Sequence, residues 1–287
     1  MTDVIHFLIQ PFSDFNFMQR ALWGCLLLSI SGTPIGVFLT LRRMSLTGDA
    51  MSHAILPGAA IGFLISGISV TAMTIGGVIA GCIVAILAGI AARHSKAEED
   101  ASMAAFYLLS LALGVLIISS KGSNMDLLHV LFGSTLALNN AALILLTLIA
   151  LITVLTLAVL YRPLVMECVD PAFFKTVSKL SGVAHYGFLL LLVLNLVAGF
   201  QALGTLMAVG LMILPATIAR FWSGRLGGMF IIAFVASITS CYIGLILSYY
   251  LGFATSPSIV LVMGGLYLLS LLFGRQGGMI FKNWSKG

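Results

Sequence analysis

The chain has 287 residues, of which 60% are hydrophobic and 8% are charged, and its formal net charge is +5. A soluble protein of this length has too little interior to hide so much apolar surface, so the composition predicts an all-α bundle of membrane-spanning helices. The basic residues lie in short stretches between apolar runs. That distribution is typical of a topology signal and argues against a nucleic-acid-binding face.

Nine apolar stretches are long enough to cross the hydrocarbon core, because a helix needs about 20 residues to do so. They cover residues 19–41, 48–66, 69–92, 103–120, 140–161, 183–201, 203–219, 229–252 and 257–274. Only residues 201–204 separate the sixth stretch from the seventh, so eight spans are the alternative. We expect one transmembrane domain that comprises residues 1–287.

Arginine and lysine predict the orientation of the spans. If the spans alternate in direction, all of the 14 basic residues except Arg20 and Lys121 fall on one side. Cytoplasmic loops of membrane proteins carry an excess of these residues. The N-terminus is therefore expected outside and the C-terminus in the cytoplasm.

An acidic residue and a histidine lie in the second span, within the stretch RRMSLTGDAMSHAILPG at residues 42–58. Asp49 and His53 are four residues apart, so on a helix they share one face with their Cβ atoms about 5–6 Å apart. At about 1.5 Å per residue, His53 lies roughly 15 Å from Arg43, near the middle of the bilayer. Ionisable groups are costly there, and this pair suits two ligands of a divalent cation such as Mn²⁺, Zn²⁺ or Fe²⁺.

Pro57 is expected to kink this helix beside the pair. Proline has no N–H, so the carbonyl group of His53 loses its helical partner and becomes a third donor at the same level. Two copies of the chain facing each other would double the ligand set, which would make dimerisation part of the mechanism. The alternative is purely structural: Asp49 caps a helix that begins at Ala50, and His53 is buried and bonded to a neighbouring helix.

A short amphipathic helix is predicted near residues 171–181, in the cytoplasmic loop after the fifth span. Asp170 suits its N-cap, Pro171 its first position and Gly182 its end. The expected apolar face comprises Phe173, Phe174, Val177 and Leu180. Such a helix either lies on the membrane surface or docks in a groove of a soluble partner.

Other polar residues are expected to have smaller roles. Asn195, in the middle of the sixth span, is expected to bridge helices. Glu167 and His185 are expected to be interfacial, and Asp126 and His129 to lie in an external loop. The sequence contains no phosphate loop of the GxxxxGK[ST] type and no catalytic motif, so any ATP-driven transport requires a separate ATPase chain.

The stretch at residues 42–58 closely resembles the second-helix signature of membrane permeases of metal-ion ABC importers, which carry manganese, zinc or iron. Weaker similarities to this family follow in order at DLLHVLFGS (126–134), VDPAFFKTVSKLSG (169–182), GTLMAVGLMILPATIAR (204–220) and GLILSYYLGFATSPSIVL (244–261). One departure is that Phe173, Phe174 and Lys175 follow the Asp-Pro pair, where the family usually has small residues.

The resemblance implies a multi-pass permease of the bacterial cytoplasmic membrane that pairs with a second copy or a paralogue. Its other partners would be two cytoplasmic ABC ATPases and an external or periplasmic metal-binding protein. Asp49 and His53 would bind the transported metal ion, and no cofactor would be bound permanently. The residues implied in the ATPase contact are Asp170, Pro171, Phe173, Phe174 and Val177.

Two other functions remain open at this point. A permease for a metal chelate, such as a siderophore or cobalamin, needs a wide pathway without protein ligands, and Asp49 and His53 argue against it. A stand-alone secondary carrier would work without an ATPase, and the lack of a long internal repeat disfavours it. The sequence does not choose between manganese, zinc and iron.

Overall fold

The structure, a computed structural model, describes residues 10–67, 69–94, 99–120, 138 and 140–280. Within these ranges nine helical stretches are long and apolar enough to cross a membrane, which confirms the predicted all-α fold and the nine spans. The helices are α2 (Asn16–Leu41), α3 (Ser45–Ala54), α4 (Leu56–Ser66), α5 (Val70–His94), α6 (Glu99–Ser120), α8 (Asn140–Val169), α9 (Pro171–Val177), α10 (Leu180–Leu203), α11 (Thr205–Trp222), α12 (Leu226–Leu251) and α13 (Thr255–Phe273). Together α3 and α4 make up the second span.

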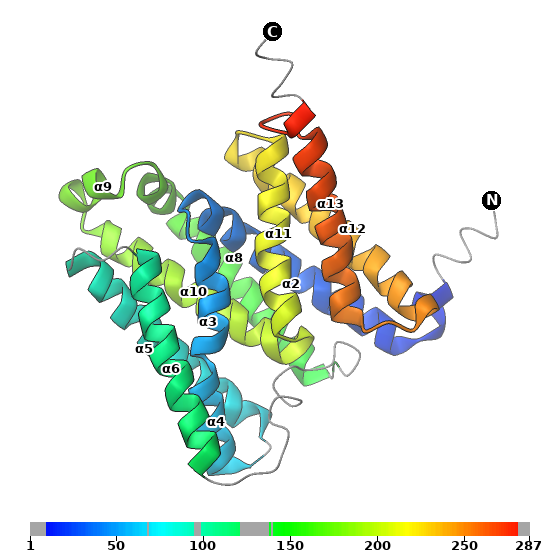
Figure 1. Cartoon of the computed structure of the whole chain (residues 1–287), viewed down its shortest axis with the longest axis horizontal. Coiled ribbons are helices and arrows are strands. Elements are labelled where there is room, and N and C mark those ends of the chain that lie inside the picture. Colours follow the sequence, from blue (N-terminus) through cyan, green and yellow to red (C-terminus); the bar gives the residue numbers. More distant parts are fainter. Residues whose placement is uncertain (1–9, 68, 95–98, 121–137, 139, 281–287) are drawn as a thin grey trace.

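Helices α2 and α10 are the most deeply buried spans of the bundle. α2 packs against α8, α11 and α12, whereas α10 packs against α5, α8 and α11. Figure 1 shows α3 to α6 grouped on one side of the molecule and α11 to α13 on the other. Phe38 of α2 and Phe188 of α10 are fully buried, and their ring centroids lie 6.2 Å apart in an edge-to-face arrangement. These two helices therefore hold the two groups together.

The turn from α2 into α3 is fixed by backbone hydrogen bonds. Arg43 adopts a left-handed conformation with φ of 59°. The Met44 N–H donates to the carbonyl of Leu39 at 2.9 Å, and the Arg43 N–H donates to the carbonyl of Thr40 at 3.3 Å. This is the Schellman arrangement of a helix end, in which glycine usually takes the left-handed position. The end of α2 thereby sets the direction in which α3 leaves.

Two helix boundaries lie where proline and glycine predict them. α3 ends at Ala54 and α4 begins at Leu56, next to Pro57. α10 and α11 are separate spans, because Gly204 between them has φ of 89°, which residues with a Cβ atom adopt only at a cost. The thin division at residues 201–204 is therefore a true helix boundary.

Two glycines allow α4 and α5 to touch through their backbones. A Cβ atom added to Gly58 of α4 would collide with the carbonyl group of Gly76 on α5, and a Cβ atom added to Gly76 would collide with the carbonyl group of Gly58. Membrane helices that lack a hydrophobic driving force gain their stability from such close packing of small residues. α4 and α5 are therefore packed as one unit.

We expect Gly76→Ala to destabilise the protein by about 1–3 kcal/mol, because α4 and α5 must move apart to admit the methyl group. The measurement is the melting temperature of the purified protein in detergent. The matched control is Gly264→Ala in α13, where no atom lies within 4 Å of an added Cβ. The control should leave the melting temperature unchanged or raise it, and equal effects of the two substitutions would contradict the close helix contact.

Candidate metal site and coupling segment

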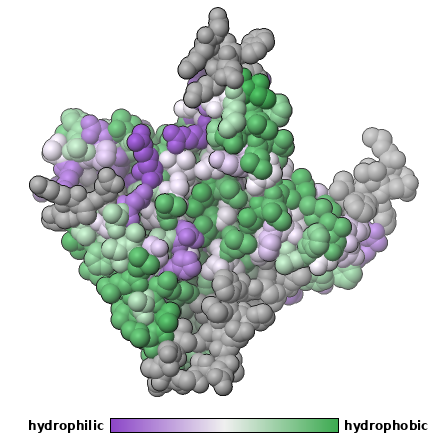
Figure 2. Space-filling model, in the orientation of Figure 1, coloured by the Kyte–Doolittle hydropathy of each residue, from purple (hydrophilic) through white to green (hydrophobic). Residues whose placement is uncertain are grey.

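Asp49 and His53 lie on α3 and are both exposed on the same face of that helix in the single chain. Leu46, one turn earlier, lies on this face as well and is 75% exposed. The opposite face of α3, with Met51 and Ala54, is buried. Figure 2 shows a small hydrophilic patch over α3 in the middle of one face of the molecule, next to apolar surface. The i, i+4 spacing thus yields the shared face that the sequence predicts.

The structure contradicts the purely structural alternative for this pair. α3 begins at Ser45, so Asp49 is the fifth residue of the helix and does not cap it. His53 is exposed rather than buried, and its ring lies beside Tyr107 of α6 with centroids 6.3 Å apart. Neither side chain is therefore accounted for by a role in helix capping or core packing.

The second span is interrupted next to Pro57, as expected. However, the carbonyl group of His53, which the proline was expected to leave without a hydrogen-bond donor, has one. The N–H of Ile55, the residue between α3 and α4, donates to the carbonyl oxygen of His53. The next carbonyl, that of Ala54, accepts a hydrogen bond of 2.9 Å from the Ser110 hydroxyl of α6. The local turn and α6 thus satisfy the backbone at the break, and a third ligand from the His53 carbonyl is not supported.

The described part of a single chain does not contain a complete set of metal ligands. Among the described residues, no group of three or more His, Cys, Asp or Glu side chains converges. Asp49 and His53 offer one carboxylate and one imidazole, whereas transition metals such as zinc usually take four ligands. Any further ligands for an ion held by this pair must come from outside the set of described acidic, histidine and cysteine side chains.

The segment that was expected to contact the ATPase, residues 170–182, is called the coupling segment. It contains a helix, α9 (Pro171–Val177), that is shorter than predicted. Asp170 caps it as expected, because its side chain accepts a hydrogen bond of 2.9 Å from the Phe173 N–H. α9 ends at Val177, and Gly182 lies inside α10 instead of ending the helix. Ser178 has extended backbone angles and ends α9 before the glycine is reached.

The apolar residues of α9 do not form one exposed face. Phe174 is buried in the main hydrophobic cluster and only 7% exposed. Phe173 and Val177 are 54% and 65% exposed. Figure 2 shows hydrophilic surface around α9 at the upper left. Phe174 therefore anchors α9 to the bundle. Phe173 and Val177 are the large apolar side chains of α9 that are open to a partner, and Leu180, at the start of α10, is 53% exposed.

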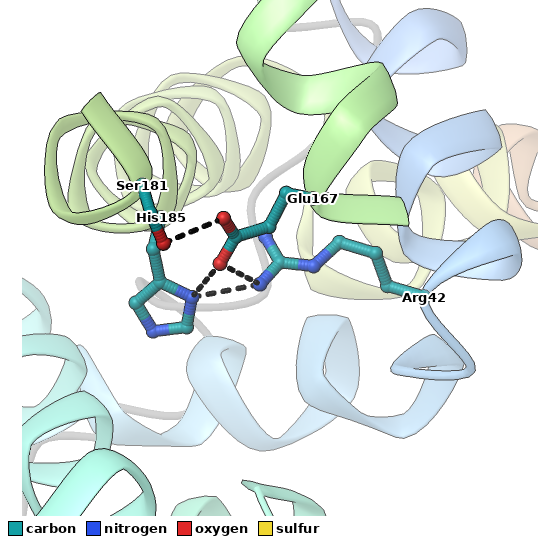
Figure 3. Close-up of polar contacts among 4 residues, drawn as sticks. All are labelled: Arg42, Glu167, Ser181 and His185. Atoms are coloured by element: carbon teal, nitrogen blue, oxygen red, sulfur yellow. Dashed lines mark hydrogen bonds and ion pairs between the residues drawn. The ribbon is translucent and has the colours of Figure 1, made fainter. Parts of the chain in front are cut away.

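A buried polar cluster lies beside α9 and was missed by the interfacial interpretation of Glu167 and His185. The cluster consists of Arg42, Glu167, Ser181 and His185 (Figure 3). Glu167 lies on the last turns of α8 and is 4% exposed, and His185 near the start of α10 is 2% exposed. The sequence signal was the occurrence of an acidic residue and a histidine just before and just after the coupling segment.

The cluster is closely bonded. An N–H of Arg42 lies 2.7 Å from Nδ1 of His185, and the Ser181 hydroxyl donates to Oε2 of Glu167 at 2.9 Å. Because a guanidinium group only donates, Nδ1 must accept, which places the proton of a neutral imidazole on Nε2. Oε1 of Glu167 lies 4.0 Å from the Arg42 guanidinium, so the buried positive charge is paired with a buried negative one.

Of the three other polar residues singled out in the sequence, Asn195 can be compared with its expected role. Asn195 bridges helices as predicted, because its amide donates to Thr153 of α8 at 2.7 Å in the buried core. Asp126 and His129, with the whole segment at residues 126–134, lie outside the described residues.

A bundle of nine spans with a short capped helix between two of them defines a polytopic membrane protein. The chain belongs to the ABC 3 transport family, whose model matches residues 14–274. It is 33% identical to the manganese transport system membrane protein MntC of Halalkalibacterium halodurans, with 97% of this chain and 94% of that protein aligned. It is 29% identical to the chelated iron transport system membrane protein YfeD of Yersinia pestis, with 93% and 88% aligned.

A solved structure supports the same assignment. PsaBC from Streptococcus pneumoniae, in complex with Fab, matches with a TM-score of 0.82 and 28% identity, over 98% of this chain and 99% of that one. The family that the 42–58 stretch resembles is thereby confirmed. Residues of the metal site and of the ATPase contact are not tested by these similarities and stay predictions.

Because Phe174 is buried in the core and Phe173 is not, substitutions of these neighbours should differ in their effect on stability. We expect Phe174→Ala to lower the free energy of unfolding of the isolated permease by about 3 kcal/mol. Phe173→Ala should change it by no more than about 0.5 kcal/mol. Thermal melts of the two variants without any partner test this, and a larger loss for Phe173→Ala would refute the assigned orientation of α9.

Proposed function

We propose that the chain is the permease subunit of an ATP-driven importer that moves a divalent transition-metal ion across the bacterial cytoplasmic membrane. Asp49 and His53 are the proposed ligands of the ion in transit. The observation that carries the proposal is the exposure of both side chains on one face of a membrane-spanning helix. Lipid offers no partner to a carboxylate, so this face requires a covering subunit or a polar pathway.

A second copy of the chain, or a paralogue, is the proposed cover. Leu46 is 75% exposed beside the pair and supplies apolar area for such a contact. Two facing copies would bring two carboxylates and two imidazoles to one pathway, which equals the four ligands that a tetrahedral ion takes. Dimerisation is then needed to complete the site.

The names of the relatives and the chemistry of the ligand atoms both indicate which metal ion is transported. Relatives are named for manganese and for chelated iron transport. Carboxylate oxygen and imidazole nitrogen are ligands that Mn²⁺, Fe²⁺ and Zn²⁺ all accept. Manganese is therefore the first ion to test, and the site itself does not exclude the other two.

The proposed orientation places α9 and the C-terminus in the cytoplasm. The excess of arginine and lysine on that side is the argument for it. Phe173 and Val177 of α9 then face the cytoplasm, where a groove of the ABC ATPase would receive them. An external or periplasmic binding protein would deliver the metal ion from the other side.

We expect Asp49→Asn and His53→Gln each to reduce Mn²⁺ transport by at least about tenfold, because each replaces a strong ligand with a neutral amide, which binds the ion more weakly. The measurement is uptake of ⁵⁴Mn²⁺ by proteoliposomes that contain the permease with its ATPase and binding protein. The matched control is Ser52→Ala, on the buried face of the same helix, which should transport normally. Full transport by both ligand variants would refute the site.

The chelate alternative has one observation in its favour, the name of the Yersinia relative. A chelated ion has its ligands already and does not need Asp49 and His53. Transport of an iron chelate that survives both ligand substitutions, with no uptake of free Mn²⁺ by the wild type, would therefore favour it. A stand-alone carrier is tested in the same vesicles, since it would take up Mn²⁺ without the ATPase.

Because Phe173 is exposed on α9, Phe173→Asp should weaken binding of the ATPase by about 30-fold, the effect of losing one hot-spot side chain. Affinity is measured by titrating the solubilised permease with the ATPase. The permease alone should keep its melting temperature, which separates lost docking from lost folding. An unchanged affinity would contradict the assigned contact.

A further inference from the structure

We propose that Arg42, Glu167, Ser181 and His185 form a clamp that passes the movement of α9 to the helix that carries Asp49 and His53. This inference rests on the proposed function, in which an ATPase acts on α9. The four residues are positioning residues, since they contact neither the proposed ion nor the proposed ATPase surface. They are called the clamp below.

Two residues of the clamp hold the two flanks of α9 together. Glu167 lies four residues before Pro171, on α8, and Ser181 lies four residues after Val177, on α10. The hydrogen bond between them, at 2.9 Å, closes the chain segment that contains α9 into a loop. Phe174 anchors α9 itself to the core. A force on α9 is therefore delivered to the adjoining ends of α8 and α10.

Arg42 connects this closed loop to α3. Its guanidinium group bonds His185 at 2.7 Å and lies over the ring of Phe188, 5.2 Å from the centroid, so two residues of α10 hold it. Its backbone is the C-cap of α2, and α3 begins three residues later at Ser45. The Schellman hydrogen bonds fix that short connection. Displacement of Arg42 thus displaces the first turn of α3, and Asp49 lies on the next turn.

The clamp transmits force better than the apolar contacts around it. Apolar packing has no preferred direction, so helices can slide past each other while they stay buried. In contrast, Arg42 and Glu167 are paired charges with side chains only 6% and 3% exposed. Separating a buried pair leaves an uncompensated charge in a medium that solvates it poorly. The end of α8 therefore cannot move away from Arg42 without a large cost.

A cavity beside the clamp gives α9 room to move. Its volume is about 650 Å³. Arg42 and Arg43 of the α2–α3 connection line it on one side, and Pro171, Ala172 and Lys175 of α9 line it on the other. α9 is thus set apart from the connection by open space, whereas the clamp joins the connection to the ends of α8 and α10 that flank α9.

The test is the number of Mn²⁺ ions transported per ATP hydrolysed by the reconstituted complex of permease, ATPase and binding protein. Glu167→Gln keeps the shape of the side chain and the Ser181 partner but removes the charge. We expect it to lower this ratio by about tenfold, the effect of losing a typical coupling free energy between two sites. Arg42→Met should do the same, and the double variant should be no worse than either single one.

Thr153→Val is the matched control. It breaks the Asn195–Thr153 hydrogen bond, which also joins α8 to α10 in the buried core but does not reach α2 or α3. It should lower the melting temperature and leave the ratio unchanged. Clamp variants that lose melting temperature but keep the ratio within about twofold would overturn the inference, because the clamp would then only stabilise the fold.

A milder variant keeps the test decisive if Glu167→Gln fails to assemble. Ser181→Ala removes only the hydroxyl that closes the loop around α9, and it should lower the ratio by about threefold. An unchanged ratio in an assembled Ser181→Ala complex would also overturn the inference. Failure of the wild-type complex to transport Mn²⁺ would instead contradict the proposed function, so the two failures are distinguishable.

Discussion

The cost of placing a charge away from water determines where the polar groups of this protein lie. The bundle accommodates its charged side chains in two different ways. Arg42 and Glu167 are buried and compensate each other inside one chain. Asp49 and His53 lie instead on an exposed face of α3. The first pair is complete within the chain and is suited to holding helices together. The second pair is incomplete, which is what a pathway for a passing ion requires.

These two polar sites are joined by a short stretch of backbone. The clamp ends at Arg42, the left-handed Arg43 turns the chain, and α3 begins at Ser45. A residue at the end of one span thereby controls the direction of the next. Transport by an ABC permease needs a mechanical connection between the ATPase and the pathway, and this stretch is short enough to be stiff. The family assignment and the geometry therefore support the same arrangement.

The sequence alone predicts most of the architecture because the hydrophobic stretches of a membrane protein are long and their ends are marked by glycine and proline. The shared face of Asp49 and His53 follows from helical periodicity. Two details do not follow. The burial of Glu167 with His185 depends on Arg42, a residue more than 120 positions away, and local patterns carry no such information. The orientation of Phe174 depends on the early end of α9 at Val177, which the later Gly182 does not indicate.

The contact between Gly58 and Gly76 has a consequence for which part of the second span can tilt. Because no side chain separates them, the backbones of α4 and α5 are in direct contact at these glycines. Rotation of either helix about its own axis would bring side chains into collision there, so the contact is a fixed point. The break at Ile55 lies immediately before this fixed point. In the proposed transport cycle, a rocking motion of the second span would thus involve its first ten residues, Ser45–Ala54. Opening and closing the proposed ion pathway would then require reorienting a helical segment about 15 Å long, α3, and not a whole transmembrane helix.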